Sequence, residues 1–216
     1  MQGLHFWGLP AGLAVALSVG VILSRQVFWE GGRPIRVILV DDAMISMGFA
    51  RSLAEGCGLV WYCGHPRVQG YTNLGWTLYM AFWHKVGLSP EYTSVPILLT
   101  GLGLLIGYVY GLYRLGKLLW GREVGLWAAW IAALFPPVIF HFSKGLEAGL
   151  LAMLGVYFLM ELLGGRRVWL LALISAVGTF VRLDFVLGVG ALLVGDRFWR
   201  GDFFQRRDWG LLLFSG

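Results

Sequence analysis

Two adjacent acids, Asp41 and Asp42, follow an apolar run that begins at Val37. One such carboxylate can act as a general base that takes the proton of an acceptor hydroxyl, while the other orients the acceptor or holds a metal. An acid here can also simply cap a helix, because unpaired N–H groups and the helix dipole favour negative charge at a helix N-terminus. Position alone leaves the catalytic and the capping interpretations about equal for these two candidate catalytic residues.

A third acid, Glu147, stands at the mouth of a later apolar segment. The helix dipole would by itself account for a carboxylate at such a helix start. If Glu147 lies on the same face as the aspartates, it becomes a third acid of one substrate-binding cavity. Asp42 and Glu147 are then the candidate ligands for a divalent metal, although the sequence makes no cofactor certain.

Four cations are available to bind a phosphate, and arginine can do so in bidentate fashion. They are Lys144, Arg182, Arg67 and Lys85. For Lys85 we favour the simpler interpretation that its long side chain reaches from the membrane interface to water.

Arg182 and Asp184 are predicted to lie below the membrane surface. Arg182 follows Arg167 by fifteen residues, which is about 22 Å of helix, whereas the hydrocarbon core is about 30 Å thick. Ionisable residues inside a membrane are candidates for function and are usually paired. The alternative is a purely structural ion pair of Arg182 with Asp184 or with Glu147.

Tyr71, Thr72 and Asn73 carry hydroxyl and amide groups that could hydrogen-bond a sugar, or cap the helix that follows them. The histidines are too isolated for a metal cluster: His65, His84 and His141. The sequence contains no phosphate-binding glycine-rich loop, no Ser–His–Asp order and no nucleic-acid-binding motif, so nucleic acid is not an expected partner.

Composition places these residues in a membrane protein. The 216 residues are 58% hydrophobic and 13% charged, with a mean hydropathy of +0.72, and long apolar stretches at this density are typical of membrane spans. The lipid bilayer is therefore an expected partner. We predict an all-α, polytopic bundle of transmembrane helices, which excludes a soluble domain.

The predicted spans are separated by polar loops, the first of which is large. The spans are about 4–24, 94–113, 123–141, 145–163, 166–181 and 185–195, with the start of another at 209. The first is predicted to be an uncleaved span. The loop 25–93 should contain two juxtamembrane helices, one starting at the Asp pair and one at Leu74–Val86, which is too short to span.

The basic loops decide the orientation. The three are 114–123, 164–167 and 196–208, and the positive-inside rule places such loops in the cytoplasm. All three share one side only if Leu74–Val86 lies flat on the membrane. The loop 25–93 and the turns at 142–147 and 182–184 then share the extracytoplasmic face. Within that loop, Cys57 and Cys63 are equally consistent with two free thiols and with a disulfide formed in an oxidising compartment.

The first loop resembles that of polytopic GT-C glycosyltransferases, which use polyprenyl-phosphate-linked sugars. The matching runs are Asp41-Asp42-Ala43-x-Ile45-Ser46, Ala50-Arg51-x-Leu53-Ala54-x-Gly56-x-Gly58-Leu59-Val60 and Gly70-Tyr71-Thr72-Asn73-x-x-Trp76. Gly145-Leu146-Glu147 is similar to the family's Gly-Leu-Glu, and Arg182-Leu183-Asp184 to its Arg-Pro-Asp/Glu turn. Bacterial membrane mannosyl- and arabinofuranosyltransferases of cell-envelope assembly are the most similar group.

The resemblance implies an enzyme of the plasma (inner) membrane with an extracytoplasmic active site. An Asp of the first loop would be the base of an inverting transfer to a hydroxyl of a glycan, lipid or protein. Gly48 and Leu183 depart from the family's usual Arg and Pro. We also expect the chain to be the N-terminal part of the module, 1–216, without the C-terminal spans and periplasmic domain of the family.

Two alternatives come from other classes. One is a multipass transporter or flippase, in which Arg182, Asp184 and Glu147 form a pathway for a solute or proton. Such a transporter should show internal repeats, and none is visible in the sequence. The other is a non-catalytic membrane partner that keeps the same fold.

Overall fold

The computed structural model describes residues 5–68, 70–165 and 167–199, and these residues are mostly helical. The chain opens with α1 (His5–Arg25), a hairpin of β1 (Val27–Glu30) and β2 (Arg33–Val37), and two short helices, α2 (Asp41–Ala54) and α3 (Leu74–Lys85). The helices that follow are α4 (Ser94–Trp120), α5 (Arg122–Leu134), α6 (Pro136–Ser143), α7 (Ala148–Met160), the π-helical turn η1 (Glu161–Gly165), α8 (Val168–Val181) and α9 (Phe185–Trp199).

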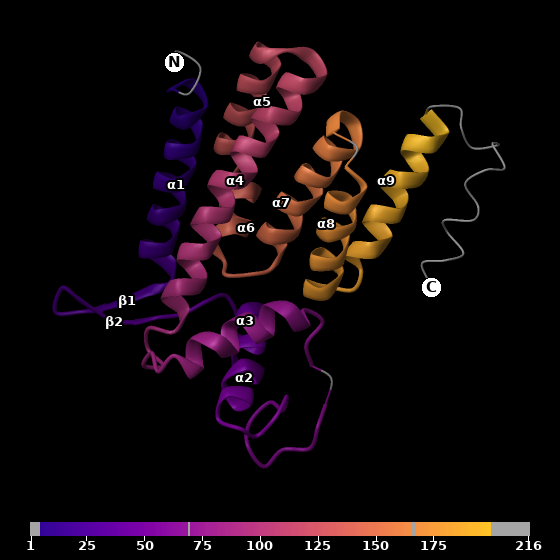
Figure 1. The fold of residues 1–216 in the computed structure, drawn as a ribbon. Helices are drawn as coiled ribbons and strands as arrows, with labels where there is room; N and C mark the ends of the chain where they lie inside the picture. Colours follow the sequence, from indigo (N-terminus) through magenta and orange to yellow (C-terminus); the bar gives the residue numbers. More distant parts are fainter. Residues whose placement is uncertain (1–4, 69, 166, 200–216) are drawn as a thin grey trace.

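The long helices run side by side, and the hairpin, α2 and α3 gather beneath one end of them (Figure 1). Three helical segments are long and apolar enough to cross a membrane: Trp7–Arg25, Ser94–Trp120 and Ala148–Gly165. A fourth is counted if α5 and α6, bent by 64° at their junction, act as one span. These segments confirm the prediction of a helical membrane protein at this coarse level.

Several boundaries differ from the predicted ones. The predicted span 94–113 continues to Trp120, so Arg114 and Lys117 lie on α4 rather than in a loop. The predicted span 123–141 breaks at Phe135, because two prolines begin α6 and cannot continue the hydrogen bonds of α5. The helix predicted over 185–195 extends to Trp199. The span predicted from 209 lies outside the described residues.

The hairpin corrects the all-α prediction. Strands β1 and β2 pair antiparallel around Gly31 and Gly32, whose φ angles are +55° and +77°. Tight hairpins need positive φ at both central residues, which glycine adopts without steric cost. The turn was missed because the sequence on either side lacks the strict polar–apolar alternation of a half-buried strand.

Helix α3 is only twelve residues long, or about 18 Å, too short to cross a bilayer. It lies across the ends of the longer helices, as Figure 1 shows. A buried cluster joins α3 to α2 and to the start of α4 through Met47, Trp76, Met80 and Ile97. This packing positions the loop residues that the sequence singled out.

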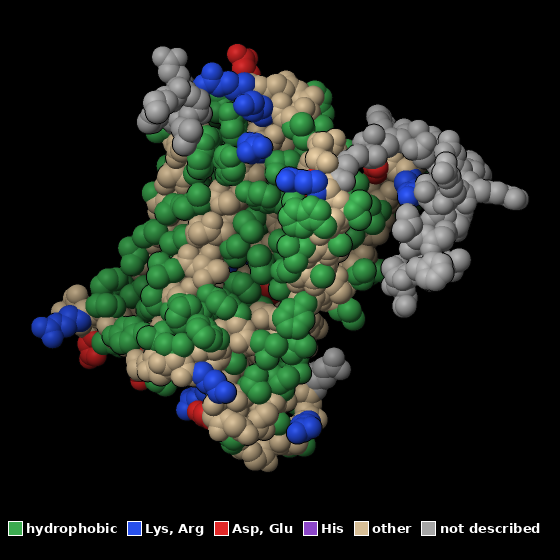
Figure 2. Space-filling view, viewed as in Figure 1, with side chains coloured by type: hydrophobic (Ala, Val, Ile, Leu, Met, Phe, Trp, Pro, Cys, Tyr) green, Lys and Arg blue, Asp and Glu red, His purple; other side chains and the backbone are tan. Residues whose placement is uncertain are grey.

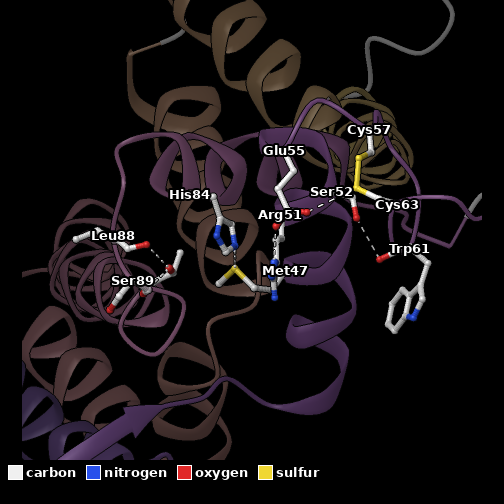
Figure 3. Close-up of polar contacts among 11 residues, drawn as sticks. Met47, Arg51, Ser52, Glu55, Cys57, Trp61, Cys63, His84, Leu88 and Ser89 are labelled. Carbon is white, nitrogen blue, oxygen red and sulfur yellow. Dashed lines mark hydrogen bonds and ion pairs between the residues drawn. A yellow bond between two sulfur atoms is a disulfide. The ribbon is translucent and has the colours of Figure 1, made fainter.

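The outer part of this region is fastened by polar contacts and a disulfide (Figure 3). Cys57 and Cys63 are joined, so of the two alternatives the structure has the disulfide. The Ser52 hydroxyl donates to the carbonyl of Trp61 at 3.3 Å. His84 of α3 lies 3.1 Å from the sulfur of Met47 on α2, where burial, and then the charge of Arg51, lower the pKa of its imidazole.

Candidate functional site

A buried carboxylate, Glu147, is the centre of a polar network at the end of the helices beside α2 and α3. Glu147 is the residue before α7, and its side chain is only 5% exposed. One of its oxygens accepts a hydrogen bond from the Asn73 amide at 2.7 Å. The other accepts one from the Arg182 guanidinium at 3.0 Å. A buried charge requires such partners, because its desolvation is otherwise very costly.

Asn73 connects this carboxylate to α2. It precedes α3 but makes no side-chain capping bond there. Its side-chain oxygen instead accepts hydrogen bonds from Ser46 of α2 at 3.0 Å and from Thr77 of α3 at 3.1 Å. All three side chains are buried, so this amide is held rigidly with its N–H group aimed at Glu147.

Arg182 lies between α8 and α9 and is held from two sides. Its Nη1 atom donates to Glu147, and its Nε atom donates to Asp184 at 3.0 Å. The Arg182 side chain is 38% exposed and that of Asp184 is 55% exposed. Arg182 is therefore a cation whose position is fixed by a buried acid while part of its guanidinium remains open to a ligand.

The turn that carries Glu147 also contacts the segment before the aspartates. The Trp76 indole donates to the carbonyl of Gly145 at 3.0 Å, and Val40 N–H faces the carbonyl of Lys144 at 3.5 Å. Gly145 has a φ of +77°, and a Cβ atom there would collide with Leu39. The close approach of these two segments therefore depends on glycine.

Asp41 and Asp42 form the first turn of α2, directly after Val40, and both are exposed. Within the described part of the chain neither carboxylate takes part in a hydrogen bond or an ion pair. The helix has no side-chain capping bond at its start, so the capping interpretation retains only the helix dipole. Two free carboxylates thus stand beside the turn that holds Glu147.

The remaining predicted residues lie in varied surroundings. The Lys144 ammonium stacks over the Phe140 ring at 3.8 Å, close in sequence to Glu147 but not bonded to it. Tyr71 packs edge-on against Phe49, with ring centroids 5.1 Å apart, and Thr72 is exposed. Among the described residues no polar contact joins Tyr71, Thr72, Arg67 or Lys85 to the Glu147 network.

The residues do not fit the proposed metal site. Both oxygens of Glu147 already accept N–H donors, and no group of three or more potential metal ligands exists within the described ranges. We therefore derive no step through a metal. Sequence reasoning also missed the part played by Ser46 and Thr77, whose only local signal is the four-residue spacing of Thr77 from Asn73.

Comparison with protein-family models, with curated proteins and with solved structures found no match. The resemblance to GT-C glycosyltransferases thus stays a prediction from the sequence motifs.

Proposed function

We propose that this protein is a membrane glycosyltransferase module that moves a sugar from a polyprenyl-phosphate donor to a hydroxyl acceptor on the extracytoplasmic face. The observation that carries the proposal is the Glu147 network. It gathers residues from three distant segments beside two exposed, unbonded carboxylates, Asp41 and Asp42. Such a combination of a fixed cation and free acids suits group transfer from a phosphate ester.

In the proposed reaction, one aspartate takes the proton of the acceptor hydroxyl as its oxygen attacks the anomeric carbon. The bond between that carbon and the donor phosphate oxygen breaks, and the phosphate leaves with the electron pair. Attack opposite the leaving group inverts the anomeric configuration. A phosphate is an adequate leaving group, so one base and correct positioning supply most of what the step requires.

Arg182 is the proposed contact to the donor phosphate. Because Glu147 and Asp184 neutralise its charge, the two acids and one cation together carry a net charge of −1. A second cation is then needed to attract a phosphate, and Lys144, on the same turn as Glu147, is the nearest in sequence. Glu147 is a positioning residue in this scheme, since it orients Arg182 without contacting the donor.

The distribution of charge favours a transferase over the transporter alternative. A transport pathway usually places its ionisable residues near the middle of the membrane, between repeated broken helices. Here Glu147, Arg182 and Asp184 lie at the ends of α7, α8 and α9, next to the layer formed by α2 and α3. A site near the ends of the helices suits a lipid-linked donor and a hydroxyl acceptor that reaches it from outside the bilayer.

The test uses the full chain reconstituted in liposomes with synthetic polyprenyl-phosphate mannose and polyprenyl-phosphate arabinofuranose as donors. Release of polyprenyl phosphate in the presence of sugar acceptors is the readout. Only one of the two aspartates is the base, so we expect one of the single variants Asp41→Asn and Asp42→Asn to lower turnover by about 10²- to 10⁴-fold. This is the usual contribution of a general base. Glu30→Gln, an exposed acid on the hairpin, is the matched control and should retain activity. If both aspartate variants keep full turnover, the base assignment is wrong.

A further inference from the structure

A polar cavity lies at the end of the helices opposite the Glu147 network and has no part in the proposed reaction. It measures about 950 Å³ and lies along α4, between the start of α1 and the end of α7 with η1. Four basic residues line it, together with aromatic side chains of α4. The basic residues are Arg114, Lys117, Arg122 and Arg167.

The cavity is electropositive. Its only acid among the described lining residues is Glu161, so four cations and one carboxylate leave a net charge of +3. Glu161 is buried and is already bound by Arg167, whose Nε and Nη2 atoms each donate to it at 2.9 Å. Arg114 and Lys117 therefore face the cavity without an acid of the described lining to neutralise them.

Arg114 and Lys117 differ in how their side chains are held. Arg114 is oriented by a hydrogen bond from its Nη1 atom to the Tyr110 hydroxyl, at 2.9 Å. Lys117, one turn later on α4, is exposed and has no polar partner among the described residues. An arginine can bind a phosphate group in bidentate fashion, and a lysine can bind it as a point charge. The π-helical turn η1 forms one wall, and such turns frequently occur at functional sites.

The position of the cavity along α4 suits the headgroup region of a bilayer. Helix α4 has 27 residues, or about 40 Å, so it exceeds a hydrocarbon core of about 30 Å. Its basic last turns must then extend into the polar layer. Exposed tryptophans at the same end, Trp120, Trp127 and Trp169, are typical of a membrane interface. Figure 2 shows Lys and Arg side chains gathered over this end, above a broad apolar band.

We propose that this cavity binds the phosphate headgroup of an anionic phospholipid from the adjacent leaflet. The cations would hold the phosphate, and the apolar lining residues Trp7, Leu118 and Met160 would contact the glycerol backbone and the upper acyl chains. Basic pockets between membrane helices commonly recognise anionic headgroups. A soluble phosphate would use the cations but leave this apolar wall uncovered. The inference does not rest on the proposed glycosyltransferase function.

The experiment measures lipid binding to the full chain in detergent by native mass spectrometry. Phosphatidylglycerol is titrated in parallel with phosphatidylcholine and with sn-glycerol 3-phosphate, which carries the phosphate without acyl chains. Lys117→Gln and the double variant Arg114→Gln/Lys117→Gln remove charge from the cavity. Arg33→Gln/Arg36→Gln removes the same charge from exposed residues of the hairpin, at the other end of the molecule, and is the matched control.

We expect phosphatidylglycerol to bind in preference to the other two ligands. Since each cation near a membrane surface contributes about 1 kcal/mol, affinity should fall roughly 5-fold in Lys117→Gln and roughly 30-fold in the double variant. The control double variant and Lys117→Arg should bind as the parent does. Lys117→Gln alone keeps the test valid if loss of the Arg114–Tyr110 bond disturbs folding.

Three results would overturn the proposal. Equal binding of phosphatidylcholine would show that charge is not recognised. Unchanged affinity in Lys117→Gln would remove the cavity as the site. Equal binding of sn-glycerol 3-phosphate would mean that the site takes a small soluble anion instead of a lipid.

Discussion

At the scale of single residues, Glu147 is the most demanding position in the molecule. It is a buried acid that accepts hydrogen bonds at once from the amide of Asn73, just before α3, and from the guanidinium of Arg182, between α8 and α9. Removing one partner from a buried charged pair costs more than the pair itself contributes, because the other partner loses its compensation. We therefore expect substitution of Glu147 to lower the stability of the protein more than substitution of the exposed Asp184.

Glu147→Gln should destabilise the protein by about 1–3 kcal/mol. The substitution removes the negative charge that holds Arg182, while the buried amide of Asn73 still requires a hydrogen-bond acceptor. Asp184→Asn removes the exposed acid from the same arginine and should cost less than about 1 kcal/mol. Thermal unfolding in detergent, followed for both variants and the parent, measures the difference. Equal losses would mean that Asp184 holds Arg182 as firmly as Glu147 does.

At the scale of helices, α4 is the element against which the others pack. It contacts α1, α5, α6 and α7, and small residues allow the close approaches. Gly101 faces the backbone of Phe142 on α6, where an added Cβ atom would collide with the carbonyl oxygen. Gly103, two residues later, has open space around its Cα atom. These two glycines therefore offer a matched pair within one helix.

Gly101→Ala should lower stability by about 1–3 kcal/mol, the usual cost of overpacking, because backbone atoms of α6 must move. Gly103→Ala should be neutral or stabilise the helix by about 0.5–1 kcal/mol, since alanine loses less backbone entropy than glycine. Detergent unfolding of the two variants provides the comparison. A similar loss at both positions would show that the α4–α6 contact does not depend on Gly101.

At the scale of the whole molecule, the two ends differ in kind. One end carries the hairpin and the short helices (Figure 1), together with the disulfide and the Glu147 network. The other end carries the basic cavity. The positive-inside rule predicts that the basic end faces the cytoplasm. A disulfide persists in an oxidising compartment, and this agrees with an extracytoplasmic position for the first end.

Single cysteines at exposed positions test this orientation. Arg33→Cys lies on the hairpin, and Glu123→Cys lies at the start of α5. A membrane-impermeant maleimide should label Arg33→Cys in intact cells and Glu123→Cys only after permeabilisation. The parent chain is the control, because its two cysteines are bonded to each other and do not react. The opposite labelling pattern would place the Glu147 network on the cytoplasmic side.

Much of the helical layout could be predicted from the sequence, because helix-forming runs and apolar length are local properties. The segment starting at Asp41 forms the predicted helix, and Pro136 and Pro137 interrupt the predicted span as their ring geometry requires. The segment from Leu74 also forms the predicted short helix. Helix ends were less well predicted, since the polar residues after 113 continue α4 instead of ending it.

Residue types and spacing alone were enough to select the candidates, which are the paired aspartates, Glu147 and Arg182. The sequence could not decide between capping, structural pairing and chemistry for them, because each choice depends on partners far away in the chain. Asn73 and Glu147 are 74 residues apart, and Glu147 and Arg182 are 35 apart. Only tertiary packing brings those groups within hydrogen-bond distance, buries Glu147 between them and leaves Asp41 and Asp42 exposed beside it.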